Sequence, residues 1–125
     1  MRIAVTGSSG RIGRYVVREL VAAEHSVVGL DVAPGAEPGC RYLRVDLTDA
    51  GQVYGALAGV QAVVHMGAWA HAGAVPDTRT YGDNTAGTFN VFQACADLGI
   101  RRVVSASSNQ VYGFAGAPPL YAPVD

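Results

Sequence analysis

The sequence predicts an α/β fold, a doubly wound parallel sheet, and three observations support that prediction. Short runs of β-branched and other apolar residues alternate with segments of helical period along the 125 residues. The runs are apolar almost throughout, which is typical of strands covered on both faces. A glycine-rich turn joins the first run to the first helical segment. The length is that of one domain with its own core.

Five segments are predicted to be strands of this sheet, joined by right-handed crossovers. A proline-rich stretch follows the fifth of them, and we expect the sheet to be truncated at about that point. The predicted strands are Arg2–Thr6, Ser26–Asp31, Arg41–Val45, Ala62–Met66 and Arg102–Ser105.

The first crossover is predicted to be a helix over Arg11–Ala23. This segment places Ile12, Val16 and Leu20 on one face, as an amphipathic helix requires. The second crossover has turn residues and no helical period, and we expect a plain loop there.

Two further helices are predicted. Thr48 is expected to cap a short helix that ends at Leu57. A third helix is expected at about Asn84–Leu98, with Gly99 as its C-terminal stop. Apolar residues spread round more than one face of this third helix, so we expect it to pack against a second subunit or a further part of the protein as well as the sheet. They are Phe89, Val91, Phe92, Ala94, Cys95 and Leu98.

Charge and composition argue against several classes of partner. Nine basic residues, all arginine, and ten acidic residues give a formal net charge of -1 at pH 7. There is no basic run, and we expect no nucleic acid partner. No window approaches about 20 apolar residues and no signal-peptide pattern is present, so we expect no membrane association and a cytoplasmic location. Cys40 and Cys95 stand alone as reduced thiols, and no metal site is predicted.

The segment after the first strand has the Gly-x-x-Gly-x-x-Gly spacing of a dinucleotide-binding turn. Gly7 permits the tight turn, Gly10 lets the backbone approach a pyrophosphate, and Gly13 lets the helix pack close to the sheet. The N–H groups at the start of that helix would bind the anion. A phosphate-binding P-loop is excluded because it requires a lysine, and the chain has none.

Asp31 ends the second predicted strand, eighteen residues after Gly13. Its carboxylate can accept hydrogen bonds from both hydroxyls of an adenosine ribose and would repel a 2′-phosphate, so NAD is the expected cofactor. Arg11 offsets part of that repulsion, and NADP stays open. The alternative is a turn and an aspartate at the edge of the sheet with no ligand.

These residues resemble the NAD-dependent epimerase/dehydratase family of extended short-chain dehydrogenase/reductases, which has a Rossmann-type fold. Four further motifs occur in the order expected of that family, and the resemblance covers the whole chain. They are Asp46-Leu47, His65-Met66-Gly67-Ala68, Asn84-Thr85-Ala86-Gly87-Thr88 and Ser107-Ser108-Asn109-Gln110-Val111-Tyr112-Gly113.

The resemblance implies one catalytic group and a set of cofactor contacts. Ser108 corresponds to the family's Ser/Thr that hydrogen-bonds the reacting oxygen of the substrate; the alternative is a serine bonded to nearby backbone. Asn109 and Gln110 stand where sugar dehydratases carry an acidic pair, and amides do not ionise, so dehydrogenase or epimerase chemistry is favoured. The implied cofactor-binding residues are Gly7, Ser9, Gly10, Arg11, Ile12, Gly13, Asp31, Asp46, Leu47, Met66, Gly67, Ala68, Asn84 and Ala106.

Three other residues have two interpretations each. His65 lies within a strand and is expected to be packed instead of catalytic. His71 is expected to be a solvated loop residue, with substrate contact as the alternative. Trp69 either lines the nicotinamide or substrate pocket or serves only in packing.

The reaction of this family needs a Tyr-x-x-x-Lys pair on one helix face, where the lysine lowers the pKa of the tyrosine. The chain has no lysine and therefore no such pair. We expect residues 1–125 to be the N-terminal, NAD(P)-binding portion of a longer enzyme, binding cofactor without turnover. The resemblance also implies a homodimer of the full-length protein.

Two functions follow. The first is an NAD-dependent oxidoreductase or epimerase that transfers a hydride between nicotinamide and a hydroxyl-bearing carbon of a sugar, sugar acid or nucleotide sugar. The second is a non-catalytic dinucleotide-binding module that senses redox state. The first is favoured because Ser108 stands in its full motif.

Overall fold

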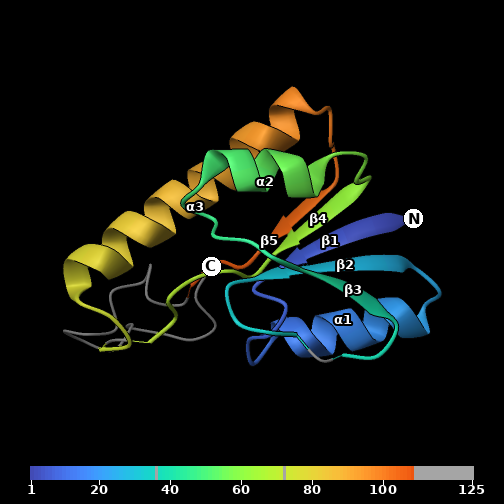
Figure 1. Ribbon diagram of the computed structural model, residues 1–125, viewed down its shortest axis with the longest axis horizontal. Helices are drawn as coiled ribbons and strands as arrows, with labels where there is room; N and C mark the ends of the chain where they lie inside the picture. The colour runs from blue at the N-terminus through green and yellow to red at the C-terminus, as the bar shows by residue number, and fades with distance from the viewer. Residues whose placement is uncertain (36, 72, 109–125) are drawn as a thin grey trace, which may run out of the picture.

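The computed structural model describes residues 1–35, 37–71 and 73–108 (Figure 1). The elements in chain order are β1 (Arg2–Thr6), α1 (Gly13–Ala22), β2 (Ser26–Asp31), β3 (Cys40–Arg44), α2 (Ala50–Leu57), β4 (Ala62–His65), α3 (Asp77–Asp97) and β5 (Val103–Ser105). The described strands all pair in parallel, in the order β3-β2-β1-β4-β5, and the fold prediction is confirmed. The predictions at Asn109 and Gln110 lie outside the described residues.

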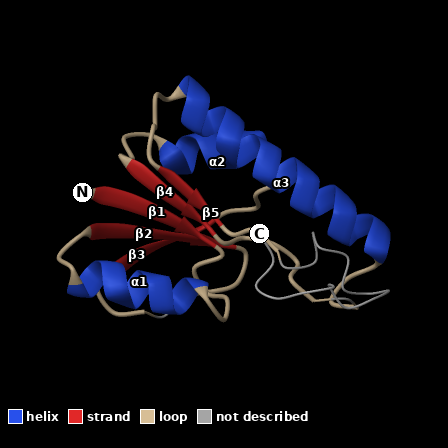
Figure 2. Ribbon diagram, turned by 180° about the vertical axis from the view of Figure 1, so that it is seen from behind, coloured by secondary structure: helices blue, strands red, loops and turns tan. Residues whose placement is uncertain are grey.

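The sheet lies between α1 on one face and α2 with α3 on the other (Figure 2). Val5 of β1 packs with Val17 of α1, whereas Ala4, its neighbour, belongs to the larger apolar cluster beneath α2 and α3. Both faces are thus buried, which explains the continuous apolar runs. The chain adds β2 and β3 on one side of β1, and then crosses over to add β4 and β5 on the other side. The position between β1 and β4 is therefore a switch point, where such sheets bind ligands.

The first helix begins later than the sequence predicts, at Gly13, and this changes its buried face. Ile12 lies in the preceding turn and is 64% exposed, so it is not a core residue. Gly13 and Val17 are buried instead, with Leu20 half-buried beside them. The difference arises because Gly10 N–H bonds to Gly7 O and closes a separate turn before the helix.

The cap of α2 is Asp49, and the prediction of Thr48 was wrong. The Asp49 carboxylate accepts the N–H of Gln52 at 3.0 Å, which also holds the pKa of Asp49 below its usual value. Thr48 instead donates its N–H and its hydroxyl to Asp46 Oδ1, at 2.9 and 2.8 Å. The neighbouring carboxylate competes for the hydroxyl that the sequence pattern assigns to the cap.

The third helix begins at Asp77, seven residues before the predicted start at Asn84, and spans 21 residues. Pro76 precedes it and Asp77 lies favourably in its first turn. Its end is as predicted, with Gly99 just beyond it at φ 69°. The two additional turns place further side chains beside the loop that follows β4.

The apolar residues of α3 divide between the core and the surface, as the sequence predicts. Val91, Ala94 and Cys95 are buried, whereas Phe89 is 64% and Phe92 43% exposed. The expected partner for this outer surface stays a prediction. No helix in the described part of the chain combines the length and the apolar character needed to cross a lipid bilayer.

Candidate functional site

A cavity of about 390 Å³ opens at the carboxyl-terminal edge of the sheet. Its walls come from the β1–α1 loop, the ends of β2 and β3, the loop after β4 and the first turns of α3. The predicted cofactor-binding residues that line it are Gly7, Ser9, Gly10, Asp31, Asp46, Leu47, Met66, Gly67, Ala68 and Asn84. Those that do not are Arg11, Ile12, Gly13 and Ala106.

The glycines of the loop after β1 allow close approaches between backbones. Gly7 has a φ of 63°, and a Cβ there would lie 2.8 Å from the backbone of Gly67. A Cβ on Gly13 would lie only 2.0 Å from Gly7 O. Gly13 was predicted to let the helix pack close to the sheet. In the structure its missing side chain lets the start of α1 pack against the backbone of the turn that follows β1. The loop and the segment after β4 therefore share one wall of the cavity.

The start of α1 has backbone donors suited to an anion. Ile12 provides no side-chain cap. Arg14 N–H bonds to Gly10 O, but within residues 1–35, 37–71 and 73–108 the structure records no acceptor for the N–H groups of Arg11 and Ile12. Free N–H groups and the positive end of the helix dipole favour a phosphate there. The residues present therefore fit a dinucleotide with its pyrophosphate at this loop.

Asp31 is held in place by the same loop, a role the sequence did not indicate. One carboxylate oxygen accepts Ser9 N–H at 2.9 Å, and the other accepts Ala33 N–H at 3.0 Å. The hydroxyl of Ser9 bonds to Ala33 O at 3.2 Å, so both donors of Ser9 have protein partners. Each carboxylate oxygen has a further lone pair, so Asp31 can still accept hydrogen bonds from two ribose hydroxyls.

His65 is buried, with 4% of its surface exposed, as expected of a packed residue. Its ring also belongs to a hydrogen-bond network. Thr6 Oγ1 accepts the N–H groups of Met66 and Gly67, at 3.1 and 3.0 Å, and lies 2.7 Å from His65 Nδ1. These two donors use both lone pairs of the hydroxyl, so its hydrogen must point to Nδ1. The ring proton is then on Nε2, 3.1 Å from Thr88 Oγ1.

We expect the stability of the protein to fall as the pH drops below about 6.5, in part because of His65. Burial lowers the pKa of His65 from its ordinary value of 6.5. As the pH falls, the imidazole of His65 is therefore protonated in the unfolded chain before it is protonated in the folded protein. Stability then falls with falling pH until the folded-state pKa is reached, by at most about 1.4 kcal/mol per pH unit. Urea unfolding between pH 7.5 and 5 measures the slope.

His65→Gln should flatten that slope whatever its effect on stability at neutral pH. His71→Gln is the matched control, because His71 is exposed in the loop after β4 and its side chain has no recorded hydrogen bond among the described residues. A His65→Gln slope equal to that of the unaltered protein would contradict the assignment.

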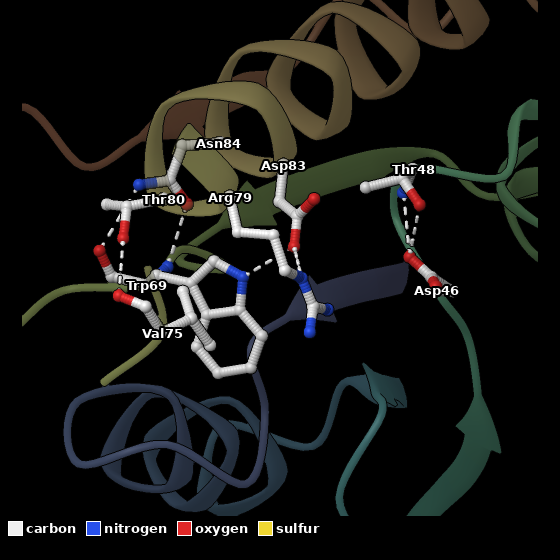
Figure 3. A network of polar contacts seen from close by, with 8 residues as sticks. All are labelled: Asp46, Thr48, Trp69, Val75, Arg79, Thr80, Asp83 and Asn84. Carbon is white, nitrogen blue, oxygen red and sulfur yellow. Dashed lines mark hydrogen bonds and ion pairs between the residues drawn. The ribbon is translucent and has the colours of Figure 1, made fainter. Parts of the chain in front are cut away.

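Trp69 lines the cavity and is fixed to α3 at three points (Figure 3). Its backbone N–H donates to Asn84 Oδ1 at 2.8 Å, and its carbonyl accepts Asn84 Nδ2 at 3.2 Å. Its indole Nε1 donates to Asp83 Oδ2 at 2.9 Å. Asn84, predicted as a cofactor contact, therefore positions the loop after β4. Trp69 thus lines the cavity, and its contact with nicotinamide or substrate stays a prediction.

Arg79 and Asp83 also line the cavity, and neither was predicted from the sequence. They belong to the part of α3 that was predicted to be loop. The Pro76-Asp77 pair was the available signal, since proline followed by an acidic residue commonly begins a helix.

Ser108 and Ala106 follow β5 at the same edge of the sheet. Ala106 N–H bonds to His65 O at 3.0 Å, which continues the β4–β5 pairing by one residue. Ser108 is exposed and lies outside the cavity wall. Within the described residues, no group of three or more His, Cys, Asp or Glu side chains could hold a metal ion.

Comparisons with known proteins place this geometry in a family. The model of the NAD dependent epimerase/dehydratase family matches residues 3–122. Uronate dehydrogenase of Pseudomonas putida is 32% identical over 117 residues, which are 90% of this chain and 42% of that protein.

Solved structures agree. A short-chain dehydrogenase/reductase superfamily protein from Agrobacterium tumefaciens with bound NAD is similar with a TM-score of 0.87 and 35% identity, over 99% of this chain and 37% of that one. Uronate dehydrogenase from Agrobacterium tumefaciens has a TM-score of 0.73 and 33% identity, over 87% of this chain and 41% of that one. The chain spans 37% to 42% of the length of these three relatives.

Proposed function

Because this chain belongs to the NAD dependent epimerase/dehydratase family, we propose that it binds NAD in the cavity at the carboxyl-terminal edge of its sheet. The observation that carries the proposal is the meeting of the glycine-rich loop and Asp31 on that cavity. The loop supplies N–H donors for the pyrophosphate, and Asp31 supplies acceptors for the adenosine ribose. The relatives solved with NAD support this assignment.

The whole protein is proposed to be an oxidoreductase or epimerase acting on a sugar, sugar acid or nucleotide sugar. NAD, when bound, would exchange a hydride with the hydroxyl-bearing carbon of the substrate. Ser108 would hydrogen-bond the reacting oxygen. The proton would be moved by a Tyr-x-x-x-Lys pair supplied by further sequence, since residues 1–125 contain no lysine. A cytoplasmic location and a homodimer through the exposed face of α3 complete the proposal.

A fluorescence titration tests cofactor binding directly. Trp69 is the only tryptophan of the chain and lines the cavity, so its emission should change as NAD binds. We expect saturable binding by the 125 residues without formation of reduced nicotinamide on glucuronate or UDP-glucose. Turnover is expected once the segment with the Tyr-x-x-x-Lys pair is present. Binding that never leads to turnover in the complete protein would favour the redox-sensing module.

Replacing Asp31 tests its place at the ribose. Asp31→Ala should weaken NAD binding about tenfold and NADP binding less, because the charge that repels a 2′-phosphate is lost. The readout is the ratio of the two dissociation constants, since losing the bonds to Ser9 and Ala33 affects both cofactors alike. Ser9→Ala is the control: it loosens the same loop without changing charge, and its ratio should stay constant. An unchanged ratio in Asp31→Ala would remove Asp31 from the ribose site.

A further inference from the structure

Arg79 is the one cationic side chain among the described residues that line the cavity, and its position is unfavourable for the helix itself. It lies in the first turn of α3, where the positive end of the helix dipole opposes a cation. Its ion-pair partner Asp83 follows it by four residues, which is the less favourable order for such a pair on a helix. Local rules are broken in this way mainly at functional sites.

The side chain of Arg79 is held by two neighbours, Asp83 of the same helix and Trp69 of the loop after β4 (Figure 3). Its Nε donates to Asp83 Oδ2 at 3.0 Å, the oxygen that also accepts Trp69 Nε1. The guanidinium carbon lies 5.7 Å from the centroid of the Trp69 ring, within cation–π range. Hydrogen bonds from Trp69 and Arg79 lower the pKa of Asp83, which stays ionised as their acceptor.

The terminal amines of Arg79 have no partner recorded in the part of the chain that the structure describes. The Asp83 bond uses Nε alone, so up to four N–H donors of the guanidinium are available in the planar fork that suits phosphate oxygens.

The charges of the other side chains along the cavity wall bear on the role of Arg79. Asp31, Asp46 and Asp83 line the cavity, so without Arg79 the charged side chains described along it would all be negative. The dinucleotide proposed for this cavity carries a pyrophosphate, and Arg11, the arginine of the glycine-rich loop, is exposed and lies outside the wall. Among the described residues of the wall, Arg79 is then the cationic side chain that can neutralise a phosphate, beside the N–H groups at the start of α1.

We propose that Arg79 is a phosphate-binding residue, whose terminal amines bind the pyrophosphate of the cofactor from the α3 wall of the cavity while the loop after β1 binds it through backbone N–H groups. This rests on the proposed binding of NAD. Trp69 and Asp83 are positioning residues, which hold the guanidinium in place before the cofactor arrives.

The test is to titrate Arg79→Gln with NAD, ADP-ribose and adenosine, following Trp69 emission or heat of binding. We expect the affinities for NAD and ADP-ribose to fall about tenfold, and that for adenosine, which has no phosphate, to stay unchanged. The salt dependence of NAD binding should also become weaker, because one cation fewer meets the anion. Arg79→Lys should recover part of the affinity, since it restores the charge without the fork.

Arg101→Gln is the matched control, because Arg101 is exposed beyond the other end of α3, and it should bind NAD as the unaltered protein does. An equal fall for adenosine would mean that Arg79 acts only through the packing of Trp69 and would overturn the proposal. Unchanged affinity of Arg79→Gln for NAD would overturn it too. If the unaltered protein binds none of the three ligands, the proposed function is refuted. The outcomes for Arg79→Gln given above concern Arg79 alone and leave the binding of NAD by the unaltered protein intact.

Discussion

Gly13→Ala is expected to destabilise the protein by about 3 kcal/mol and to weaken NAD binding at least tenfold. The new methyl group would lie 2.0 Å from Gly7 O, 2.8 Å from Gly7 C and 3.0 Å from Ser8 Cα. These are backbone atoms, and no change of side-chain rotamer relieves the contact. The start of α1 must move away from β1, and the N–H groups proposed to bind the pyrophosphate move with it. Urea unfolding and an NAD titration measure the two effects.

Gly55→Ala is the control for this prediction. Gly55 lies inside α2, and a Cβ there would meet no atom within 4 Å apart from its chain neighbours and the backbone of its own helix. Alanine should therefore stabilise the protein by about 0.5–1 kcal/mol through its higher helix propensity and the smaller entropy of the unfolded chain. If the free energy of unfolding of Gly13→Ala instead equals that of the unaltered protein, the result contradicts the close approach of Gly13 to the backbone of Gly7.

Ser108→Ala is expected to lower kcat of the complete enzyme about 100-fold and to leave the dissociation constant of NAD unchanged. The hydroxyl is proposed to donate a hydrogen bond to the reacting oxygen, and such a bond matters most when charge develops on that oxygen. NAD affinity should be preserved because Ser108 lies outside the wall of the cavity. Steady-state kinetics and the Trp69 titration, each on the same variant, separate the two quantities.

Ser107→Ala provides the comparison, since Ser107 is equally exposed beyond β5 but does not match the position of the catalytic serine. It should retain most of the activity. Equal losses in the two variants would indicate that this segment acts through its conformation instead of through one hydroxyl.

Much of the fold could be predicted because its signals are local. The apolar runs located every described strand to within about one residue, since two-sided burial leaves a pattern within each strand. The boundaries of helices were less predictable. Thr48 and Asp49 both suit a helix cap, and the choice was decided by the competing bond from Thr48 to Asp46. The early start of α3 at Asp77 was missed because Gly82 and several polar residues weaken its helical period.

The candidate site was predictable in part for the same reason. Gly7, Gly10 and Asp31 belong to one strand–turn–helix–strand unit, and their spacing alone brought them to one edge of a sheet. Arg79 and Asp83 were missed because they reach the cavity only through the path of α3 across the sheet. No pattern within α3 indicates that Trp69 will lie beneath them.

The sequence by itself determined the α/β class, the parallel strands and the glycine-rich loop, because burial and backbone sterics act over a few consecutive residues. The tertiary structure alone decided the order of the strands, the contact of Gly7 with Gly67, and the bond between Asp31 and Ser9 that fixes the loop. It also decided that, among the described residues, Arg79 would lie with three carboxylates at the cavity. These features join residues from different elements, and only the packing of helices on both faces of the sheet brings those elements together.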